Sequence, residues 1–431
     1  MSCPEPKILT LSCWSHSISF HLYSWDGKAE LAAGTVERVA LGGSSIHQRV
    51  PGREAFSLET EYTDHQSAVA LIIATLTDPR HGVIADAGEI SAVGHRVAHG
   101  GEEFRHSVQI DAHVLDAIRK LQHLAPLHCA PNIAGIEAAM GRLPDVPHMA
   151  IFDTAFHLSM PECAYIYPLP YEWYEKYGVR RYGFHGPSHL YISRRAAVLL
   201  DKPVDTCNLI TIHLDKGVSL CAIKNGRSID TSMGMTPLEG AVMETRSGDI
   251  DAGILAYMMR MMNLSAREME QILNQKSGIS GITGRRPGRQ GFLEAVVDED
   301  TRCKLVLEIE TYRIKKYIGS YLAIIGPLDG VVFTAGAGAS EWLVRDMVLN
   351  GLECFGIGFE RVRNRAIRSG QAEVEITAED SLIRTFIIPT NEELVYVEDV
   401  AAIHSGIYSD HQRHDYSFAQ RGFIPFGTIG K

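Results

Sequence analysis

The stretch from residue 8 to residue 31, ILTLSCWSHSISFHLYSWDGKAEL, contains the pattern that decides the fold. An apolar run, a polar turn, an alternating run, an Asp26-Gly27 turn and a further run predict a β-hairpin continuing into a third strand. Residues 208–231, NLITIHLDKGVSLCAIKNGRSIDT, repeat this order around an Asn225-Gly226 turn. Two copies of one plan indicate two similar half-structures whose polar turns can present backbone N–H groups to an anion. Hairpins also recur in many unrelated sheets, however, and periodicity alone slightly favours that alternative.

The remaining segments alternate between helical and strand patterns. Helical periodicity predicts helices at residues 112–121, 131–140, 188–200, 251–262, 265–274 and 304–325. Short apolar runs predict strands at residues 90–93, 149–152, 331–334 and 385–388. This alternation indicates an α/β protein, and 431 residues with 45% hydrophobic content are enough for two domains, with a cleft available between them.

Charge and apolar patterning exclude several classes of partner. A formal charge of -11 and a pI near 5.9 oppose binding to nucleic acid or to an anionic membrane, which need a positive surface. No apolar run is long enough to cross a bilayer, and the first residues lack a signal-peptide pattern, so we expect a cytoplasmic protein with a small-molecule partner. The eight cysteines show no metal-ligand spacing and are expected to be mostly buried thiols.

Two segments place charged side chains at the ends of predicted strands. GHRVAHGGEEF, residues 94–104, carries Arg96 ahead of two glycines, where a guanidinium can bind a carboxylate through two hydrogen bonds. MAIFDTAFHLSMP, residues 149–161, puts Asp153 directly after an apolar strand, the position from which α/β folds direct carboxylates into a cleft. A structural salt bridge or a helix cap is the alternative for each.

Four further segments have the composition of ligand-binding loops. RRYGFHGPSH, residues 180–189, gathers Arg180, Arg181, His185 and His189; the long polar loop 230–251 carries Arg246. VVFTAGAGASEW, residues 331–342, is a strand followed by small residues that let a nucleotide approach backbone N–H groups. FIIPTNEEL, residues 386–394, ends on Glu392 and Glu393, one of which can reach a hydrated Mg²⁺.

Taken together and in order, these motifs resemble the acetate/propionate kinase (acetokinase) family from about Lys7 to Asp399. They are GHRVAHGG, LAPLH, IFDTAFH, RRYGFHG, DTSMGMTPLEG, TRSGDID, KSG and IPTNEEL. The resemblance implies a duplicated two-domain fold of the actin and hexokinase type (ribonuclease H-like) and a homodimer. The domains expected are residues 1–150, residues 151–402 with most of the nucleotide site, and an irregular tail of residues 403–431.

By resemblance, the site residues fall into four groups. The catalytic group is Asp153, His185 and Arg246, and the substrate-binding group is Arg96, His128, Ala98, Leu127, Phe184 and Pro237. The nucleotide-binding group is His213, Leu214, Asp215, Lys216, Gly217, Gly336, Ala337, Gly338, Ala339 and Ser340, and the metal group is Glu392 and Ser12. The implied reaction is reversible phosphoryl transfer from ATP, with Mg²⁺, to acetate or propionate. Propionate is included because Ala98 replaces the usual valine and widens the acyl pocket.

The chain departs from the family pattern mainly where the donor's phosphates bind. The substituted positions are Ser12 for asparagine, Trp14 for glycine, Ser19 for lysine, Asp215 and Lys216 for glycine and asparagine, and Glu244 for glycine. Residues 282–292, ITGRRPGRQGF, also differ, which leaves Arg285, Arg286 or Arg289 as substitutes for the usual nucleotide contact. Two alternatives therefore stay open: a noncatalytic or regulatory homologue that binds a carboxylate or acyl phosphate, and a kinase using another donor such as pyrophosphate.

Overall fold

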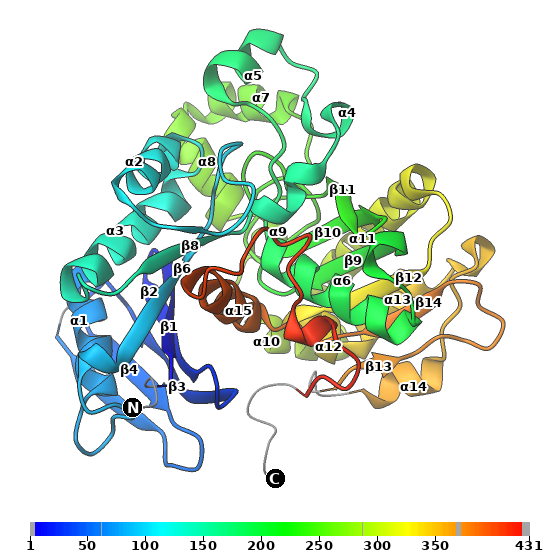
Figure 1. Ribbon diagram of the computed structural model, residues 1–431. Helices are drawn as coiled ribbons and strands as arrows, with labels where there is room; N and C mark the ends of the chain where they lie inside the picture. The colour runs from blue at the N-terminus through cyan, green and yellow to red at the C-terminus, as the bar shows by residue number, and fades with distance from the viewer. Residues whose placement is uncertain (1–4, 62, 287, 368–371, 425–431) are drawn as a thin grey trace. The chain divides into compact units, whose positions relative to one another are not determined.

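The computed structural model describes residues 5–61, 63–286, 288–367 and 372–424. The chain divides into two compact units (Figure 1). The first unit contains the chain up to Phe156 together with the residues from Asn391 onward, and the second contains His157–Thr390. Within the described residues, no helix is both long and apolar enough to span a membrane.

The first unit is built on a mixed sheet, eight-stranded within the described residues, in the order β5-β4-β3-β2-β1-β6-β8-β7. The bounds are β1 Lys7–Trp14, β2 Ser17–Ser24, β3 Ala29–Glu37, β4 Ser44–Arg49, β5 Phe56–Thr60, β6 Ile90–Val97, β7 Val108–Gln109 and β8 His148–Phe152. Strands β1 to β5 form an antiparallel meander, while β6 pairs in parallel with both β1 and β8. The parallel strands therefore end at one edge of the sheet.

Four longer helices belong to the first unit: α1 His65–Leu76, α2 Ala112–Lys120, α3 Pro126–Arg142 and α15 Glu392–His404. Helix α1 begins where Asp64 accepts a hydrogen bond from the Ser67 amide, and α3 begins at a proline whose missing N–H costs nothing in a first turn. Their apolar faces pack on the sheet around buried side chains such as Leu9, Phe20 and Ile72.

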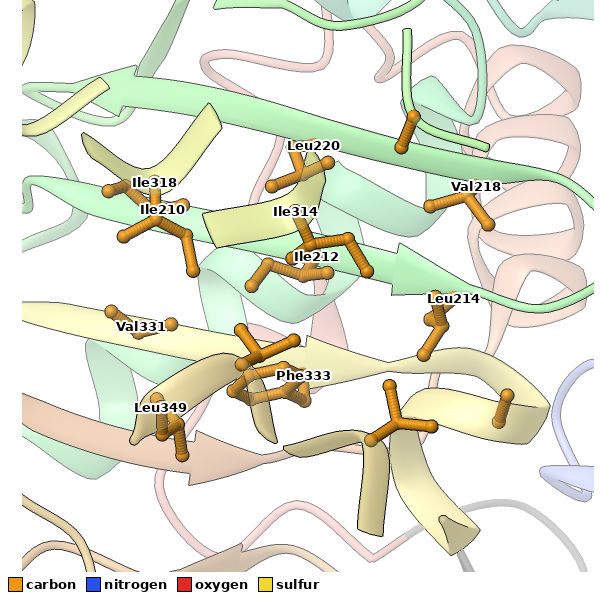
Figure 2. Close-up of a cluster of buried hydrophobic side chains, with 14 of the residues drawn as sticks. Ile210, Ile212, Leu214, Val218, Leu220, Ile314, Ile318, Val331, Phe333 and Leu349 are labelled. Carbon is orange, nitrogen blue, oxygen red and sulfur yellow. The ribbon is translucent and has the colours of Figure 1, made fainter. Parts of the chain in front are cut away.

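The second unit contains a sheet, six-stranded within the described part of the chain, in the order β11-β10-β9-β12-β14-β13. The bounds are β9 Leu209–Leu214, β10 Val218–Lys224, β11 Arg227–Thr231, β12 Gly330–Thr334, β13 Val374–Glu375 and β14 Arg384–Ile387. Figure 2 shows its core, in which Ile212 of β9, Leu220 of β10 and Phe333 of β12 meet Ile314 of a long helix, α11. These side chains are completely buried.

The helices of the second unit are α4 Glu162–Tyr165, α5 Tyr171–Tyr177, α6 Gly186–Leu200, α7 Gly253–Met262, α8 Ala266–Gln275, α9 Gly278–Thr283, α10 Gly288–Val297, α11 Thr301–Ile325, α12 Ala335–Ser340, α13 Trp342–Leu349 and α14 Arg361–Ala366. Residues 232–252 contain no helix or strand, as predicted for the long polar loop. Each predicted helix is present, although the one expected at 131–140 begins earlier, at Pro126.

The predicted duplication is confirmed strand by strand. In each unit an antiparallel meander, β1-β2-β3 or β9-β10-β11, has its first strand paired in parallel with a later strand, β6 or β12. The turn of the first hairpin is shorter than expected, because β1 continues to Trp14 and β2 begins at Ser17. Strand β6 likewise continues beyond residue 93 to Val97 and carries Arg96 inside the sheet.

The last helix lies in a different unit from the one expected. Residues up to 402 were expected in the C-terminal domain, but α15 packs on β6 and β1 of the first unit. Gly94 permits this packing, since a β-carbon on Gly94 would stand 2.6 Å from Cγ2 of Val400. Beyond α15 the described tail has only one short 3₁₀ helix, Ser417–Ala419. The cysteines within the described residues are free thiols, and five of them are buried.

Candidate active site

Arg96 and Asp153 form a buried ion pair at the edge of the first sheet where the parallel strands end. Arg96 stands near the end of β6, and Asp153 follows the last residue of β8, with its amide donating to the Val97 carbonyl at 3.0 Å. The Arg96 Nε donates to Asp153 Oδ1 at 3.0 Å, and Nη2 bonds Oδ2. The third nitrogen, Nη1, is buried and has no hydrogen-bond partner among the described residues.

A second carboxylate, Glu392, stands near this pair. It lies in the first turn of α15, and its charge acts on both Arg96 and Asp153. Burial raises the pKa of Asp153 to about 6, Arg96 opposes the rise and Glu392 adds to it. Neighbouring Glu393 faces elsewhere, because its Oε2 accepts a hydrogen bond from the Thr10 hydroxyl at 2.7 Å. The two neighbouring glutamates therefore have different surroundings.

These carboxylates suit Mg²⁺, which proteins hold through one or two carboxylates plus substrate phosphates and water. No group of three or more metal-ligating side chains occurs within the described part of the chain. Ser12, the other predicted metal residue, is buried in β1 directly opposite Arg96 in the strand register. Ser12 and Glu392 therefore both belong to the surroundings of Arg96.

The residues expected around the acyl group have different environments within the first unit. Ala98 is buried, and its amide donates to Asn132 Oδ1 at 2.9 Å. His128 is half-buried in the first turn of α3. Leu127 precedes it with 44% of its surface exposed, and its carbonyl accepts from the Ser15 hydroxyl. Sequence reasoning missed Asn132, whose only signal was a polar residue on an apolar helix face.

In the second unit, His185 and Arg246 converge on the turn between β9 and β10. A β-carbon on Gly217 would stand 3.1 Å from Cε1 of His185 and 3.5 Å from Nη1 of Arg246. A β-carbon here would be tight against the His185 ring and in ordinary contact with Arg246, so both side chains lie close to this turn. His185 Nδ1 lies 2.9 Å from the Ser219 hydroxyl oxygen, and its ring stacks on that of His213 with centroids 4.0 Å apart.

Arg246 carries a positive charge that no carboxylate neutralises within the described part of the chain. Its Nη1 donates to the Pro237 carbonyl at 3.2 Å and to the Met243 sulfur at 3.4 Å. Desolvation lowers the pKa of Arg246, and an arginine remains charged in proteins regardless. A partly buried guanidinium without a counter-ion is costly to keep unpaired, and an anion could offset that cost. Pro237, predicted for the acyl pocket, therefore touches a predicted catalytic residue.

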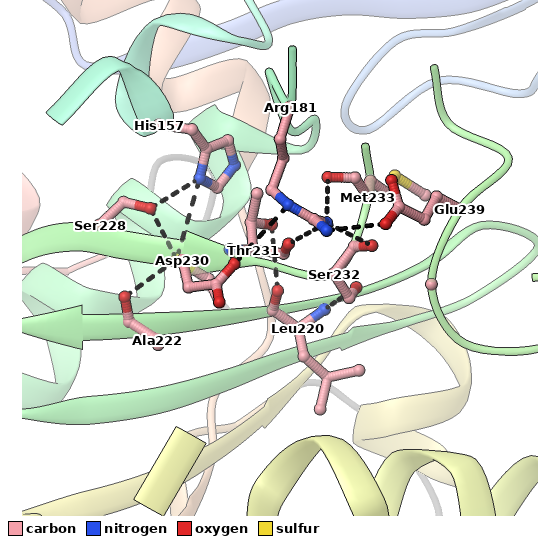
Figure 3. Close-up of polar contacts among 12 residues, drawn as sticks. His157, Arg181, Leu220, Ala222, Ser228, Asp230, Thr231, Ser232, Met233 and Glu239 are labelled. Atoms are coloured by element: carbon pink, nitrogen blue, oxygen red, sulfur yellow. Dashed lines mark hydrogen bonds and ion pairs between the residues drawn. The ribbon is translucent and has the colours of Figure 1, made fainter. Parts of the chain in front are cut away.

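Other cationic side chains of the RRYGFHGPSH segment serve the fold instead. Figure 3 shows Arg181 donating to the carbonyls of Thr231, Ser232 and Met233 and to Glu239 Oε1 at 2.7 Å. These bonds use the guanidinium for structure, so the expectation that Arg181 supplies donors to an anion is not supported.

Two more residues of this segment have structural surroundings. Arg180 lies over the Tyr165 ring at 3.5 Å. His189 is fully buried between the Thr211 and Ser219 hydroxyls, and burial lowers its pKa well below the usual value. Phe184 is also buried, in the hydrophobic core of the second unit. Sequence reasoning missed Ser219. Its hydroxyl is hydrogen-bonded to both His185 and the buried His189, so it links the orientation of the His185 ring to that of His189.

On the predicted nucleotide side, Asp215 stands beside the small-residue helix. Its Oδ1 lies 3.2 Å from the position of a β-carbon on Gly336, within helix α12. Although Lys216 and Asp215 are adjacent in the sequence, no ion pair joins them in the described residues. Asp215, Lys216, Glu244 and Arg289 help to line a cavity of about 90 Å³.

Arg289 is not available as a substitute phosphate ligand. Its Nε lies 2.8 Å and 2.9 Å from the two oxygens of Glu341, and its Nη1 donates to the buried Glu310 at 2.8 Å. Arg285 is paired with Asp300, and Arg286 donates to the Gln275 carbonyl. The positive charge of Arg289 is therefore neutralised by two carboxylates.

The model of the Acetokinase family matches residues 7–398. The chain belongs to the acetokinase family. It is 59% identical to the acetate kinase of Geobacter sulfurreducens over 417 residues, which cover 97% of this chain and 99% of that relative.

Two solved structures of the acetokinase family share the fold. The crystal structure of Porphyromonas gingivalis acetate kinase matches with a TM-score of 0.87 at 39% identity, covering 92% of this chain and 99% of that one. A propionate kinase from Francisella tularensis matches with a TM-score of 0.85 at 34% identity over the same shares. The predicted duplicated α/β fold is thereby confirmed.

Proposed function

We propose that the chain is a short-chain carboxylate kinase that reversibly transfers the γ-phosphoryl group of ATP to acetate or propionate. The observation that carries this proposal is the uncompensated charge of Arg246 beside His185 at the Gly217 turn. Arg96 supplies a second guanidinium with an unused nitrogen. Relatives named acetate kinase and propionate kinase support the choice of acyl acceptor.

The chemistry requires little beyond positioning and charge neutralisation. An acetate or propionate carboxylate is already ionised near pH 7, so no general base has to remove a proton. Arg96 would hold the carboxylate, and Arg246 and His185 would stabilise the negative charge of the transferring phosphoryl group. Glu392 and Ser12 would hold Mg²⁺, which neutralises donor phosphates when bound.

The decisive experiment is a hydroxylamine-trapping assay on the purified chain with acetate or propionate, Mg²⁺ and ATP. Mg²⁺-dependent acyl hydroxamate is expected, and Arg246→Gln should abolish it while Arg260→Gln, on exposed helix α7, should not. No hydroxamate with any acid tested, together with acetate binding by calorimetry, would support the noncatalytic homologue instead.

The charge of Asp215 makes pyrophosphate a second candidate phosphoryl donor. Its carboxylate lies beside Gly336, where the resemblance places donor phosphates. Pyrophosphate should therefore be compared with ATP in the same assay. Faster turnover with pyrophosphate would replace ATP in the proposal and leave the acceptor unchanged.

We further propose a homodimer in the cytoplasm. Helix α7 supports the dimer, because Ile254, Tyr257, Met261 and Met262 all expose between 46% and 66% of their surfaces. Such an apolar face on a helix is typical of an interface. Light scattering should report twice the chain mass, and Met261→Glu should shift it toward the monomer; cell fractionation tests the location.

A further inference from the structure

Trp14 is a large apolar side chain to which the proposed function assigns no role. It is the last residue of β1, and 40% of its surface is exposed. The centre of its ring lies 3.9 Å from Cζ of Arg96, so the indole covers one face of the guanidinium. Attraction between an aromatic face and a guanidinium strengthens as the pair loses water, and Arg96 is only 7% exposed.

The backbone on either side of the indole is held in place by polar contacts. The Trp14 carbonyl lies 2.9 Å from Nε2 of His65, the first residue of α1. The Cys13 carbonyl accepts from Nδ2 of Asn132 at 2.7 Å, and the same amide accepts from the Ala98 N–H. Ala98 lies two residues after Arg96. Asn132 therefore connects the end of β1, which carries Trp14, to the end of β6, which carries Arg96.

Arg96 is thus restrained on two sides and keeps one nitrogen without a hydrogen bond within the described residues. Asp153 occupies Nε and Nη2, and the indole covers a face. Nη1 remains, buried and without a hydrogen-bond partner within the described residues. A buried cationic donor left unpaired is unfavourable until an acceptor arrives, so this nitrogen points to a ligand.

We infer that Trp14 is a positioning residue for the carboxylate substrate. The indole fixes the plane of the Arg96 guanidinium and excludes water from one face, so that the Nη1 side is presented to a carboxylate. The inference rests on the proposed function in that Arg96 binds that carboxylate. The family resemblance puts glycine at this position, so the arrangement belongs to the tryptophan of this chain.

The first test compares Trp14→Ala, Trp14→Gly and Trp14→Phe in the full-length chain. Loss of the ring should raise the acetate KM about tenfold, equivalent to roughly 1.4 kcal/mol, with kcat at saturating acetate and MgATP nearly unchanged. Trp14→Phe keeps an aromatic face and should restore most of the affinity. Trp173→Ala, a substitution of a 43% exposed tryptophan in α5, is the matched control.

The second test needs no turnover and no truncated side chain. Replacing Trp25, Trp173 and Trp342 by phenylalanine leaves Trp14 as the single tryptophan of the chain. Titration with acetate alone should change its fluorescence saturably, and Arg96→Met should abolish the change. If the chain binds acetate this way but forms no acyl phosphate, the kinase proposal fails while the inference stands. An acetate KM unaffected by Trp14→Ala, or fluorescence indifferent to acetate, overturns the inference.

Discussion

The carboxylate of Asp215 lies against the backbone of Gly336, with Oδ1 3.2 Å from the place of a β-carbon on that glycine. At a separation of 4 Å and an effective dielectric of 20, like charges repel by about 4 kcal/mol. Asp215 has no ion-pair partner among the described residues, so this repulsion would act on any phosphate bound there.

Asp215→Asn, which keeps the shape of the side chain, is therefore expected to lower the MgATP KM by about tenfold, a gain of roughly 1.4 kcal/mol. The acetate KM should not change. Calorimetric titration with MgATP measures the affinity directly, and exposed Asp205→Asn serves as the charge control. Weaker nucleotide binding in the Asp215 variant would mean that this carboxylate takes part in holding the donor.

The buried pair of Arg96 and Asp153 predicts a non-additive loss of stability. Arg96→Met leaves a buried carboxylate unpaired and should lower the free energy of unfolding by about 3–5 kcal/mol. Adding Asp153→Asn should recover part of that loss, because the uncompensated charge is removed. Urea denaturation of the two single variants and the double variant completes the cycle. Additive losses would show that the pair is not coupled.

His185 is expected to act on the rate rather than on binding. His185→Asn should lower kcat by about 10²–10³-fold with little change in either KM, since the group stabilises charge that develops during transfer. Ser219→Ala removes the hydroxyl 2.9 Å from Nδ1 and should produce a smaller loss of the same kind. His404→Asn, at the exposed end of α15, is the control. An equal rise in KM would assign His185 to substrate binding.

The acyl pocket predicts a change of substrate preference at Ala98. Ala98→Val adds two methyl groups to a buried position, each apolar carbon being equivalent to about 0.8 kcal/mol. The added volume should reduce the ratio of kcat/KM for propionate to that for acetate several-fold. Parallel assays with both acids measure it. A ratio that stays the same would place Ala98 outside the acyl pocket.

The tail predicts a pH dependence of stability. Burial raises the pKa of Glu398 to about 7, against hydrogen bonds from Ser417 that lower it. A carboxyl group whose pKa is higher in the folded state binds protons more tightly there, so its contribution favours folding at low pH. That contribution declines as the pH rises from about 4.5 to 7, and its full size is roughly 3 kcal/mol.

Glu398→Gln should therefore flatten the decline in unfolding free energy between pH 5 and pH 8, as urea denaturation at several pH values would show. Exposed Glu54→Gln is the matched control and should reproduce the wild-type slope. An unchanged slope in the Glu398 variant would exclude this residue as the titrating group.

The hairpins and the six helices expected from periodicity were predictable because local pattern determines them. Asp26-Gly27 and Asn225-Gly226 mark turns in any context, and strand ends at one sheet edge bring Arg96 to Asp153. By contrast, Arg96 and Arg181 are the same residue type. Only tertiary contacts show that Nη1 of Arg96 has no hydrogen-bond partner among the described residues, while both terminal nitrogens of Arg181 donate to carbonyls or to Glu239.

Two further features depend on contacts between residues far apart in the chain. The contact of Trp14 with Arg96 requires the parallel register of β1 and β6, which no short motif reveals. The sequence also does not reveal which unit contains α15. This helix directly follows the second unit in the chain, but it packs on β6 and β1 of the first unit.

The position of α15 also has a consequence for biosynthesis. Residues 157–390 form one uninterrupted unit, whereas the first unit combines the chain up to Phe156 with a helix that is made only after the whole of the second unit. The β6 surface beside Gly94 therefore stays uncovered until the ribosome has produced Val400. The half that is synthesised first is, for this reason, the half that matures last.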